Sequence, residues 1–224
     1  MGRDNQAKVR QLRRQSTKEA RRASHPRILI VTEGSKTEPL YIEEIRTKYQ
    51  LHSANVAVQP SHLGTAPIQV VRYAQRLFVD GDLQRGIRPK GFDQIYAVFD
   101  RDDHESYFNA LNLATSLDGK LRNDDRQAVS FKAIASVPSF ELWLLLHYED
   151  LQAPISRDMA IARLKQYIPG YDKGAVDSFA TTSSRLETAT QRALALAAKF
   201  NAHTAPEPFT AVHELVKLLT TLRD

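Results

Sequence analysis

The sequence predicts an α/β fold, in which a mostly parallel sheet is flanked by helices and followed by a helical C-terminal half. Two observations predict it. Runs of β-branched and aliphatic residues alternate with helix-like segments up to about residue 150, a pattern typical of parallel strands joined by helical crossovers. Beyond that point only helical patterns remain. We therefore expect a flexible basic arm over residues 1–24, an α/β domain over 25–150, and a helical cover of the same domain over 151–224.

Four strands and four helices are expected in the first half. The strands are predicted over residues 27–32, 54–61, 92–100 and 130–136. The helices are predicted over residues 37–49, from 64–67 onward, over 105–117 and over 139–148. Thr37 or Ser35 is expected to cap the first helix, with Pro39 tolerated in its first turn. The strongly apolar segment 92–100 is expected to be central in the sheet.

The second half reads as helices with recognisable starts. Ser156 is expected to cap a helix that ends before Pro169. Residues 184–187 form a Ser-x-x-Glu capping box, which predicts a helix reaching about Phe200. A last helix is predicted over about 210–222.

Two features of the apolar helix 139–148 are also predicted. Trp143 and the leucines that follow it are expected in the core. His147 is expected at the surface or as a helix C-cap.

Composition narrows the kinds of site that the protein can hold. The chain of 224 residues contains no cysteine, which excludes disulfides and thiolate metal sites. Any metal must therefore be held by carboxylates, histidines or backbone oxygens, and oxygen ligands favour Mg²⁺ or Mn²⁺. No apolar run approaches the roughly 20 residues of a membrane span, and no secretory signal is evident. We expect a cytoplasmic protein without a membrane partner.

The N-terminal arm carries more positive charge than the whole chain. Residues 1–24 hold eight Lys and Arg residues against two acidic residues, whereas the formal net charge of the chain is +5. Such an arm is typical of segments that bind nucleic-acid phosphates. A solvated tail without a specific partner is the alternative. The candidate phosphate ligands are Arg10, Arg13, Arg14, Arg21 and Arg22.

Carboxylates follow three of the predicted strands. Glu33 follows the first, Asp100 and Asp102 follow the third, and Glu141 lies just past the fourth. Because the carboxyl ends of parallel strands lie at one edge of a sheet, these side chains are expected to converge. Gly34 is expected to allow a tight turn and to leave room for a ligand.

The Asp-x-Asp spacing supports a metal site. Residues two apart at an extended strand end point the same way, so Asp100 and Asp102 are expected to face one cation, which would relieve their mutual repulsion. The alternative is that Asp102 or Asp103 caps the helix 105–117. A supporting or solvent-facing role is favoured for His104 over a ligand role.

Three motifs resemble those of a known family. "VTEGSKTEPLY", "YAVFDRDDH" and "VPSFELWLLLHY" resemble the RloB-like family, which is tied to bacterial abortive infection against phage. The closing "FTAVHELVKLL" is similar to the family's C-terminal helix. That family is similar to the Toprim fold, a Rossmann-like sheet whose signature is Glu-Gly after the first strand and Asp-x-Asp after a later one. Glu33-Gly34 and Asp100-Arg101-Asp102 match that signature.

The resemblance extends to the overcoming-lysogenization-defect nucleases. It implies that Ser139 and Glu141 form a Ser-x-Glu pair that helps to hold a second metal ion. Glu38 matches a further acidic residue of those enzymes with one extra residue of spacing, so it is either a ligand or a favourable charge at a helix N-terminus. Glu33 is implied as a ligand or general base. The candidates for stabilising the charge of the transition state are Lys36, Arg101 and Lys132.

These observations leave three functional hypotheses. The first is a Mg²⁺- or Mn²⁺-dependent Toprim nuclease acting on RNA or DNA, an effector of anti-phage defence beside a partner ATPase. The second is a non-catalytic nucleic-acid-binding subunit of a defence complex. The third is a haloacid-dehalogenase-like phosphatase, which is disfavoured because its Asp-x-Asp follows the first strand and because Glu33 would stay unexplained.

Overall fold

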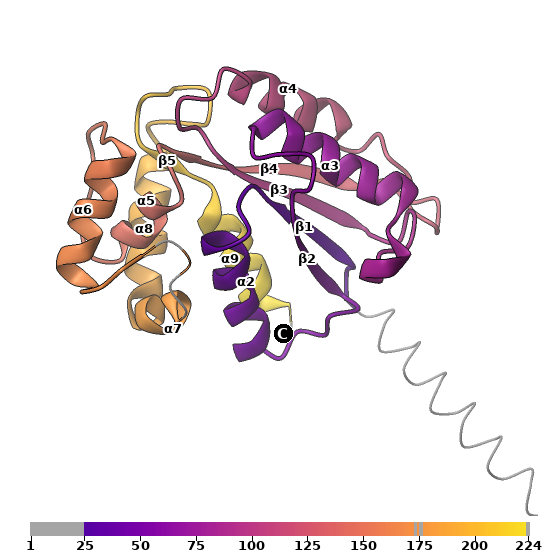
Figure 1. The fold of residues 1–224 in the computed structure, drawn as a ribbon, viewed down its shortest axis with the longest axis horizontal. Helices are drawn as coiled ribbons and strands as arrows, with labels where there is room; N and C mark the ends of the chain where they lie inside the picture. The colour runs from indigo at the N-terminus through magenta and orange to yellow at the C-terminus, as the bar shows by residue number, and fades with distance from the viewer. Residues whose placement is uncertain (1–24, 173, 175–176, 223–224) are drawn as a thin grey trace, which may run out of the picture.

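The protein folds around one five-stranded sheet. The structure, a computed structural model, describes residues 25–172, 174 and 177–222, so the predicted basic arm lies outside the described residues. The strand order is β2-β1-β3-β4-β5 (Figure 1), and all pairs are parallel except β4 with β5. The strands are β1 (Ile28–Thr32), β2 (Val56–Pro60), β3 (Gln94–Asp100), β4 (Ser130–Val137) and β5 (Phe209–Thr210). The predicted α/β class with a mostly parallel sheet is confirmed.

Helices cover both faces of this sheet. Helices α3 (Pro67–Asp80) and α4 (Tyr107–Leu117) lie on one face, and α2 (Thr37–Lys48) and α9 (Val212–Thr221) lie on the other (Figure 1). Strand β3 occupies the middle of the sheet, as predicted, and its side chains are buried from Ile95 onward. The strongly apolar strands are therefore those that are covered on both faces.

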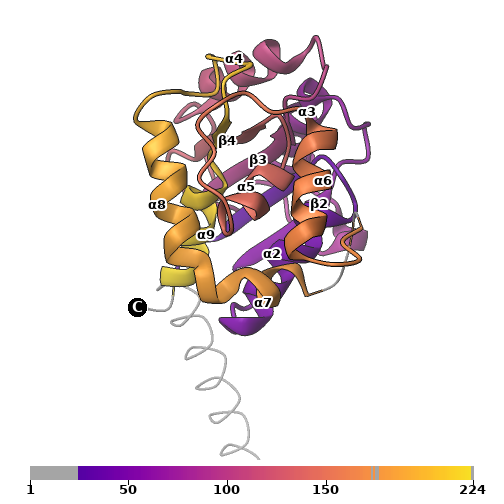
Figure 2. The same cartoon turned by 90° about the vertical axis from the view of Figure 1, so that its left-hand side faces the viewer.

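The helical second half gathers at one end of the sheet. It contains α5 (Glu141–Leu146), α6 (Arg157–Tyr167), α7 (Ser178–Thr182) and α8 (Leu186–Ala197), and α5 lies between α6 and α8 (Figure 2). All six residues of α5 are buried, as expected of a helix that is apolar nearly all round. None of the described helices has the length and apolarity needed to cross a membrane.

Side chains of α5 tie this half to the sheet and confirm its predicted core role. The indole of Trp143 donates a hydrogen bond to the hydroxyl of Tyr41 in α2 at 2.9 Å. His147 is the C-cap residue, and its Nδ1 lies 3.0 Å from the carbonyl oxygen of Trp143. Burial lowers the pKa of His147 to about 4, so the ring is neutral. The C-cap prediction is confirmed, whereas a surface position is wrong.

Two predicted element starts need correction, and a third is confirmed. The N-cap position of α2 is Lys36, and no side chain caps the helix. The capping box at 184–187 does not form, because α7 and the 3-10 turn η2 (Ser183–Arg185) already hold the preceding chain in helical conformation, whereas an N-cap needs extended backbone. Ser156 does cap α6, since its Oγ accepts a hydrogen bond from the Met159 amide at 3.3 Å.

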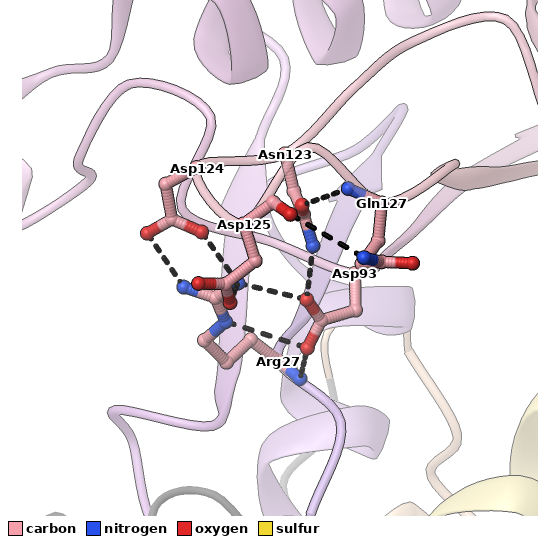
Figure 3. Close-up of polar contacts among 6 residues, drawn as sticks. All are labelled: Arg27, Asp93, Asn123, Asp124, Asp125 and Gln127. Atoms are coloured by element: carbon pink, nitrogen blue, oxygen red, sulfur yellow. Dashed lines mark hydrogen bonds and ion pairs between the residues drawn. The ribbon is translucent and has the colours of Figure 1, made fainter.

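An ionic network fixes the opposite edge of the sheet, where the parallel strands begin (Figure 3). Arg27, which precedes β1, donates two side-chain hydrogen bonds to Asp124 at 2.8 and 2.6 Å and two to Asp93 at 2.8 and 3.3 Å. Asn123 also donates to Asp93, at 2.8 Å. Hydrogen bonds from Arg27 help to lower the pKa of Asp93 against the effect of burial. The network joins the starts of β1 and β3 to the loop before β4. The candidate site lies at the other end of these strands.

Candidate metal centre

A polar pocket of about 460 Å³ opens where β1 and β3 end. Its walls come from the loops after β1, β2 and β3 and from the starts of α2, α5 and α6, which is where ligands bind in open parallel sheets. The lining residues are Glu33, Gly34, Ser35, Lys36, Thr37, Glu38, Ser61, Thr65, Asp102, His104, Glu141 and Arg157.

Glu33 is fixed by the neighbouring strand. Its backbone amide donates to the Val98 carbonyl at 2.9 Å, which extends the pairing of β1 with β3 by one residue. Its Oε2 accepts a hydrogen bond from the Asp100 amide at 2.9 Å. Its Oε1 lies 3.7 Å from Nε2 of His104. The strand end therefore delivers a carboxylate of defined orientation, as predicted.

The two aspartates of the Asp-x-Asp motif occupy different environments. Asp100 is the last residue of β3 and is only 3% exposed, whereas Asp102 lines the pocket. The predicted extended geometry is wrong, because the chain turns here and Asp102 adopts a left-handed φ of 34°. The Asp102 amide donates to the carbonyl of Pro138 at 3.0 Å, which holds this turn against the end of β4. A left-handed non-glycine residue beside a pocket is a common feature of functional sites.

The helix-capping alternative for the acidic cluster is contradicted. Helix α4 begins at Tyr107, its N-cap position is Ser106, and no side chain caps it. Asp102 and Asp103 therefore do not cap this helix.

Glu33, Asp102 and His104 form a group that fits a metal ion. Each offers one ligand atom, and these atoms lie within 4.8 Å of one another. Two carboxylates suit hard cations such as Mg²⁺ and Mn²⁺, and an imidazole also suits transition ions. The geometry therefore makes His104 a potential ligand, whereas the sequence favoured a supporting role.

The Ser-x-Glu pair also converges on the pocket. Ser139 Oγ donates a hydrogen bond to Oε2 of Glu141 at 2.6 Å, and both side chains are buried. Glu141 is the first residue of α5 and faces the pocket. Burial raises the pKa of the Tyr171 phenol, and the nearby Glu141 carboxyl raises it further. Ser139 and Tyr171 are thus polar neighbours of the Glu141 carboxylate.

Glu38 lies in the pocket and is only 7% exposed. Its Oε2 would be 2.9 Å from a Cβ placed on Gly34, so the missing side chain of Gly34 leaves room for this carboxyl. Gly34 does not adopt a left-handed φ. The space beside Gly34 is therefore occupied by the Glu38 carboxyl, whereas it was predicted to leave room for a ligand, and no left-handed turn requires a glycine here.

The carboxyl groups in and beneath the pocket raise one another's pKa values. Burial raises the pKa of Glu38 to about 7, and the charges of Glu33 and Glu141 add to the effect. Burial raises the pKa of Asp100 well above its usual value, and Glu38, Glu33 and Glu141 again add to the effect. Carboxyls that compete for protons in this way mark a site suited to a cation.

Arg157 is the cation that sequence reasoning missed. It begins α6 and reaches from the helical half to form an ion pair with Asp102. One feature of the sequence could have indicated it. A positive charge in the first turn of a helix opposes the helix dipole, so an arginine at that position needs a reason such as a nearby acidic site. Ser61 and Thr65, which line the pocket from the chain after β2, gave no comparable signal.

The three predicted cations lie in different places. Lys36 lines the pocket. Arg101 donates to the backbone carbonyl of Asp102 and is not among the lining residues. Lys132 lies in β4, about 13 Å along the strand from Ser136, where its Nζ is 4.0 Å from Glu214. The structure therefore brings Lys36 to the carboxylates and leaves Lys132 away from them. The arginines of the arm lie outside the described residues.

Comparison with known families gives one match. The model of a family described as RloB-like protein matches residues 28–219, which include all the residues that line the pocket. Comparison with curated proteins and with solved structures gives no match.

Proposed function

The chain belongs to the RloB-like protein family, and we propose that it is a divalent-metal-dependent nuclease of the Toprim type that cleaves phosphodiester bonds in RNA or DNA. One observation carries this proposal. Four carboxylates, Glu33, Glu38, Asp102 and Glu141, line one pocket at the carboxyl end of a parallel sheet, with an imidazole among them. A divalent cation that also binds phosphate would neutralise this clustered negative charge.

The residues have distinct roles in this proposal. Glu33, Asp102 and His104 would hold the first ion, and Glu141, oriented by Ser139, would hold a second, which leaves Glu38 free to act as a base. Asp100 supports the site through its backbone amide, which donates a hydrogen bond to the Glu33 carboxylate. One or two Mg²⁺ or Mn²⁺ ions supply activation of the attacking water and neutralisation of the charge that develops on the phosphate.

Hydrolysis also needs a group that accepts a proton. The water oxygen bonds to phosphorus, and the bond from phosphorus to the leaving sugar oxygen breaks. One proton of the water passes to a carboxylate, and the leaving oxygen takes a proton from solvent. Glu38 suits this role because burial and neighbouring charges raise its pKa to about 7, close to the working pH of a general base. Glu33 is the alternative acceptor. Lys36 lines the same pocket and is placed to bind a phosphate oxygen.

The phosphatase hypothesis fits the structure poorly. A haloacid-dehalogenase-like enzyme uses the first aspartate of its Asp-x-Asp pair as a nucleophile, which must be ionised and accessible. Asp100 is 3% exposed, and burial raises its pKa well above the usual range. In addition, the pair follows β3, the third strand along the described chain.

The test is a cleavage assay with a matched control. Labelled single-stranded RNA, single-stranded DNA and duplex DNA are incubated with the full chain in Mg²⁺, in Mn²⁺ and in chelator. We expect cleavage of at least one substrate with metal and none with chelator. Asp102→Asn, which keeps the size of the side chain, is expected to lower the rate by about a hundredfold or more. Asp103→Asn changes an exposed neighbour outside the pocket and is expected to retain activity.

Two outcomes would count against the nuclease. Binding of nucleic acid without cleavage under every metal condition, unchanged by Asp102→Asn, favours the non-catalytic subunit. Equal cleavage by the Asp102→Asn and wild-type proteins points to a contaminating nuclease.

The family also suggests a setting for this activity. We propose that the protein is an effector of anti-phage defence that acts beside a partner ATPase. If so, the chain alone cleaves slowly, and adding a partner ATPase of the defence system accelerates the same metal-dependent reaction. That partner is therefore included in a second arm of the assay.

A further inference from the structure

Arg157 stands out among the pocket residues because it comes from the helical half and carries the opposite charge. Its Nη1 forms an ion pair with Oδ2 of Asp102, one of the three candidate metal ligands. Burial opposes the positive charge, yet Asp102, Glu141, Asp100 and Glu33 together raise the pKa of Arg157. The guanidinium therefore sits in the field of the same carboxylates that a metal ion would use.

The contacts of Arg157 suggest that this pairing is only part of its role. Its Nε is buried without a hydrogen-bond partner among the described residues. A buried N–H without a partner is costly, and beside a pocket a bound ligand is one way to satisfy it. A guanidinium also presents several donors in a plane that matches the oxygens of a phosphate.

We propose that Arg157 holds the place of the metal ion in the metal-free protein and then, released from Asp102 by the ion, binds a non-bridging oxygen of the substrate phosphate. The proposal rests on the proposed function and adds to it the residue that couples metal binding to substrate binding.

Electrostatics explains why the two cations exclude each other. A divalent ion among Glu33, Asp102 and His104 lies close to the guanidinium that pairs with Asp102. Repulsion between like charges at such separations, at the effective dielectric of a protein surface, is large enough to change affinities by about tenfold. The ion pair between Arg157 and Asp102 therefore lowers the affinity of the site for a metal ion. When the ion binds, the guanidinium turns toward the open pocket, where a substrate phosphate replaces Asp102 as its partner.

The test measures metal and nucleic acid binding separately. Mn²⁺ is titrated calorimetrically into the wild-type protein, Arg157→Met and Arg163→Met at pH 8, where protons compete least with the metal. Arg163 lies on the same helix, forms a half-buried ion pair with Glu149 away from the pocket, and serves as the control. We expect Arg157→Met to bind Mn²⁺ about tenfold more tightly than the wild-type protein, and Arg163→Met to match the wild type.

Binding of labelled 20-nucleotide RNA and DNA is then measured by anisotropy in Ca²⁺. Arg157→Met is expected to bind about tenfold more weakly, with Arg157→Lys intermediate because it keeps the charge but not the planar fork. If Arg157→Met does not fold, Arg157→Gln, which also removes the positive charge, takes its place in both measurements.

The outcomes separate the two claims. If the wild-type protein binds no Mn²⁺, the proposed function fails. If it binds Mn²⁺ but removal of the guanidinium leaves that affinity unchanged or weaker, the inference about Arg157 is overturned while the metal centre stands. Tighter Mn²⁺ binding with unchanged nucleic-acid binding also overturns it, because Arg157 would then be only a counter-ion.

Discussion

At the scale of single residues, the pocket depends on carboxyls that are held where water cannot stabilise their charge. Glu38 is the clearest case, because its carboxyl occupies the space left by Gly34 and lies close to Glu33 and Glu141. Burying like charges together is unfavourable without a cation or a proton between them. The metal-free protein therefore holds protons that a divalent ion would displace.

This leads to a prediction about stability and pH. The folded-state pKa values of Glu38 and Asp100 are raised, so the folded chain binds more protons than the unfolded chain and stability is lost as pH rises through them. Between pH about 6.5 and 8.5, Glu38 alone is expected to cost about 1 kcal/mol, or about 2–4 °C in melting temperature. Thermal unfolding in chelator measures the loss.

Glu38→Gln is the matched variant for that measurement. Burial lowers the pKa values of His147 and His213, so these groups affect stability in the opposite direction and at lower pH. Both proteins contain them, so their effect cancels when the two stability profiles are subtracted. The variant is expected to lose less stability over this pH range than the wild type. Parallel pH profiles for the two proteins would show that Glu38 does not titrate there.

The sequence predicted some site residues well and others poorly, for physical reasons. Glu33, Asp102 and Glu141 could be predicted because parallel strands bring their carboxyl ends to one edge. The different environments of Asp100 and Asp102 could not, since Asp102 adopts a left-handed φ that no motif encodes. Arg157 could not, because it reaches the site from a helix distant in sequence.

At the scale of elements, one carboxylate attaches the helical half to the sheet domain. Glu44 of α2 accepts hydrogen bonds from the amides of Ser178, Phe179 and Ala180 at 2.9–3.1 Å. These are the unpaired first-turn amides of α7, and a negative charge also favours that end of a helix. The nearby Thr37 Oγ1 accepts from the Gly174 amide at 3.2 Å.

Removing that carboxylate tests its role. Glu44→Ala is expected to lower the free energy of unfolding by about 2 kcal/mol and the melting temperature by about 4–8 °C. Glu43→Ala, which removes a neighbouring surface ion pair with Arg46, is expected to change stability by less than about 1 kcal/mol. Chemical denaturation of both variants decides the matter, and equal losses would mean that Glu44 has no special role.

Element prediction succeeded where patterns were long and failed where they were short. The strands β1 and β3 are continuous apolar runs, and their positions follow from the sequence. The strand β5 has only two residues and owes its existence to pairing with Ser136 and Val137. The last helix was therefore expected to begin at about residue 210, whereas it begins only at Val212.

At the scale of the whole molecule, the helical half completes the pocket as well as covering the sheet. The sheet domain supplies Glu33, Glu38, Asp102 and His104, and the helical half adds Arg157 through α6. Glu141 lies at the junction, where α5 packs between α6 and α8. Separating the two halves would therefore expose the carboxylates and remove their positive partner. The role of the basic arm in binding nucleic acid stays a prediction from its charge.

The central claim is that this pocket binds divalent cations, and crystals soaked in Mn²⁺ test it most directly. The anomalous difference map is expected to contain a peak bounded by Glu33, Asp102 and His104, with the Arg157 guanidinium moved away from Asp102. The same soak of Asp102→Asn crystals is expected to lose that peak. A map with no peak in the pocket at saturating Mn²⁺, or with peaks only on surface carboxylates, would contradict the account.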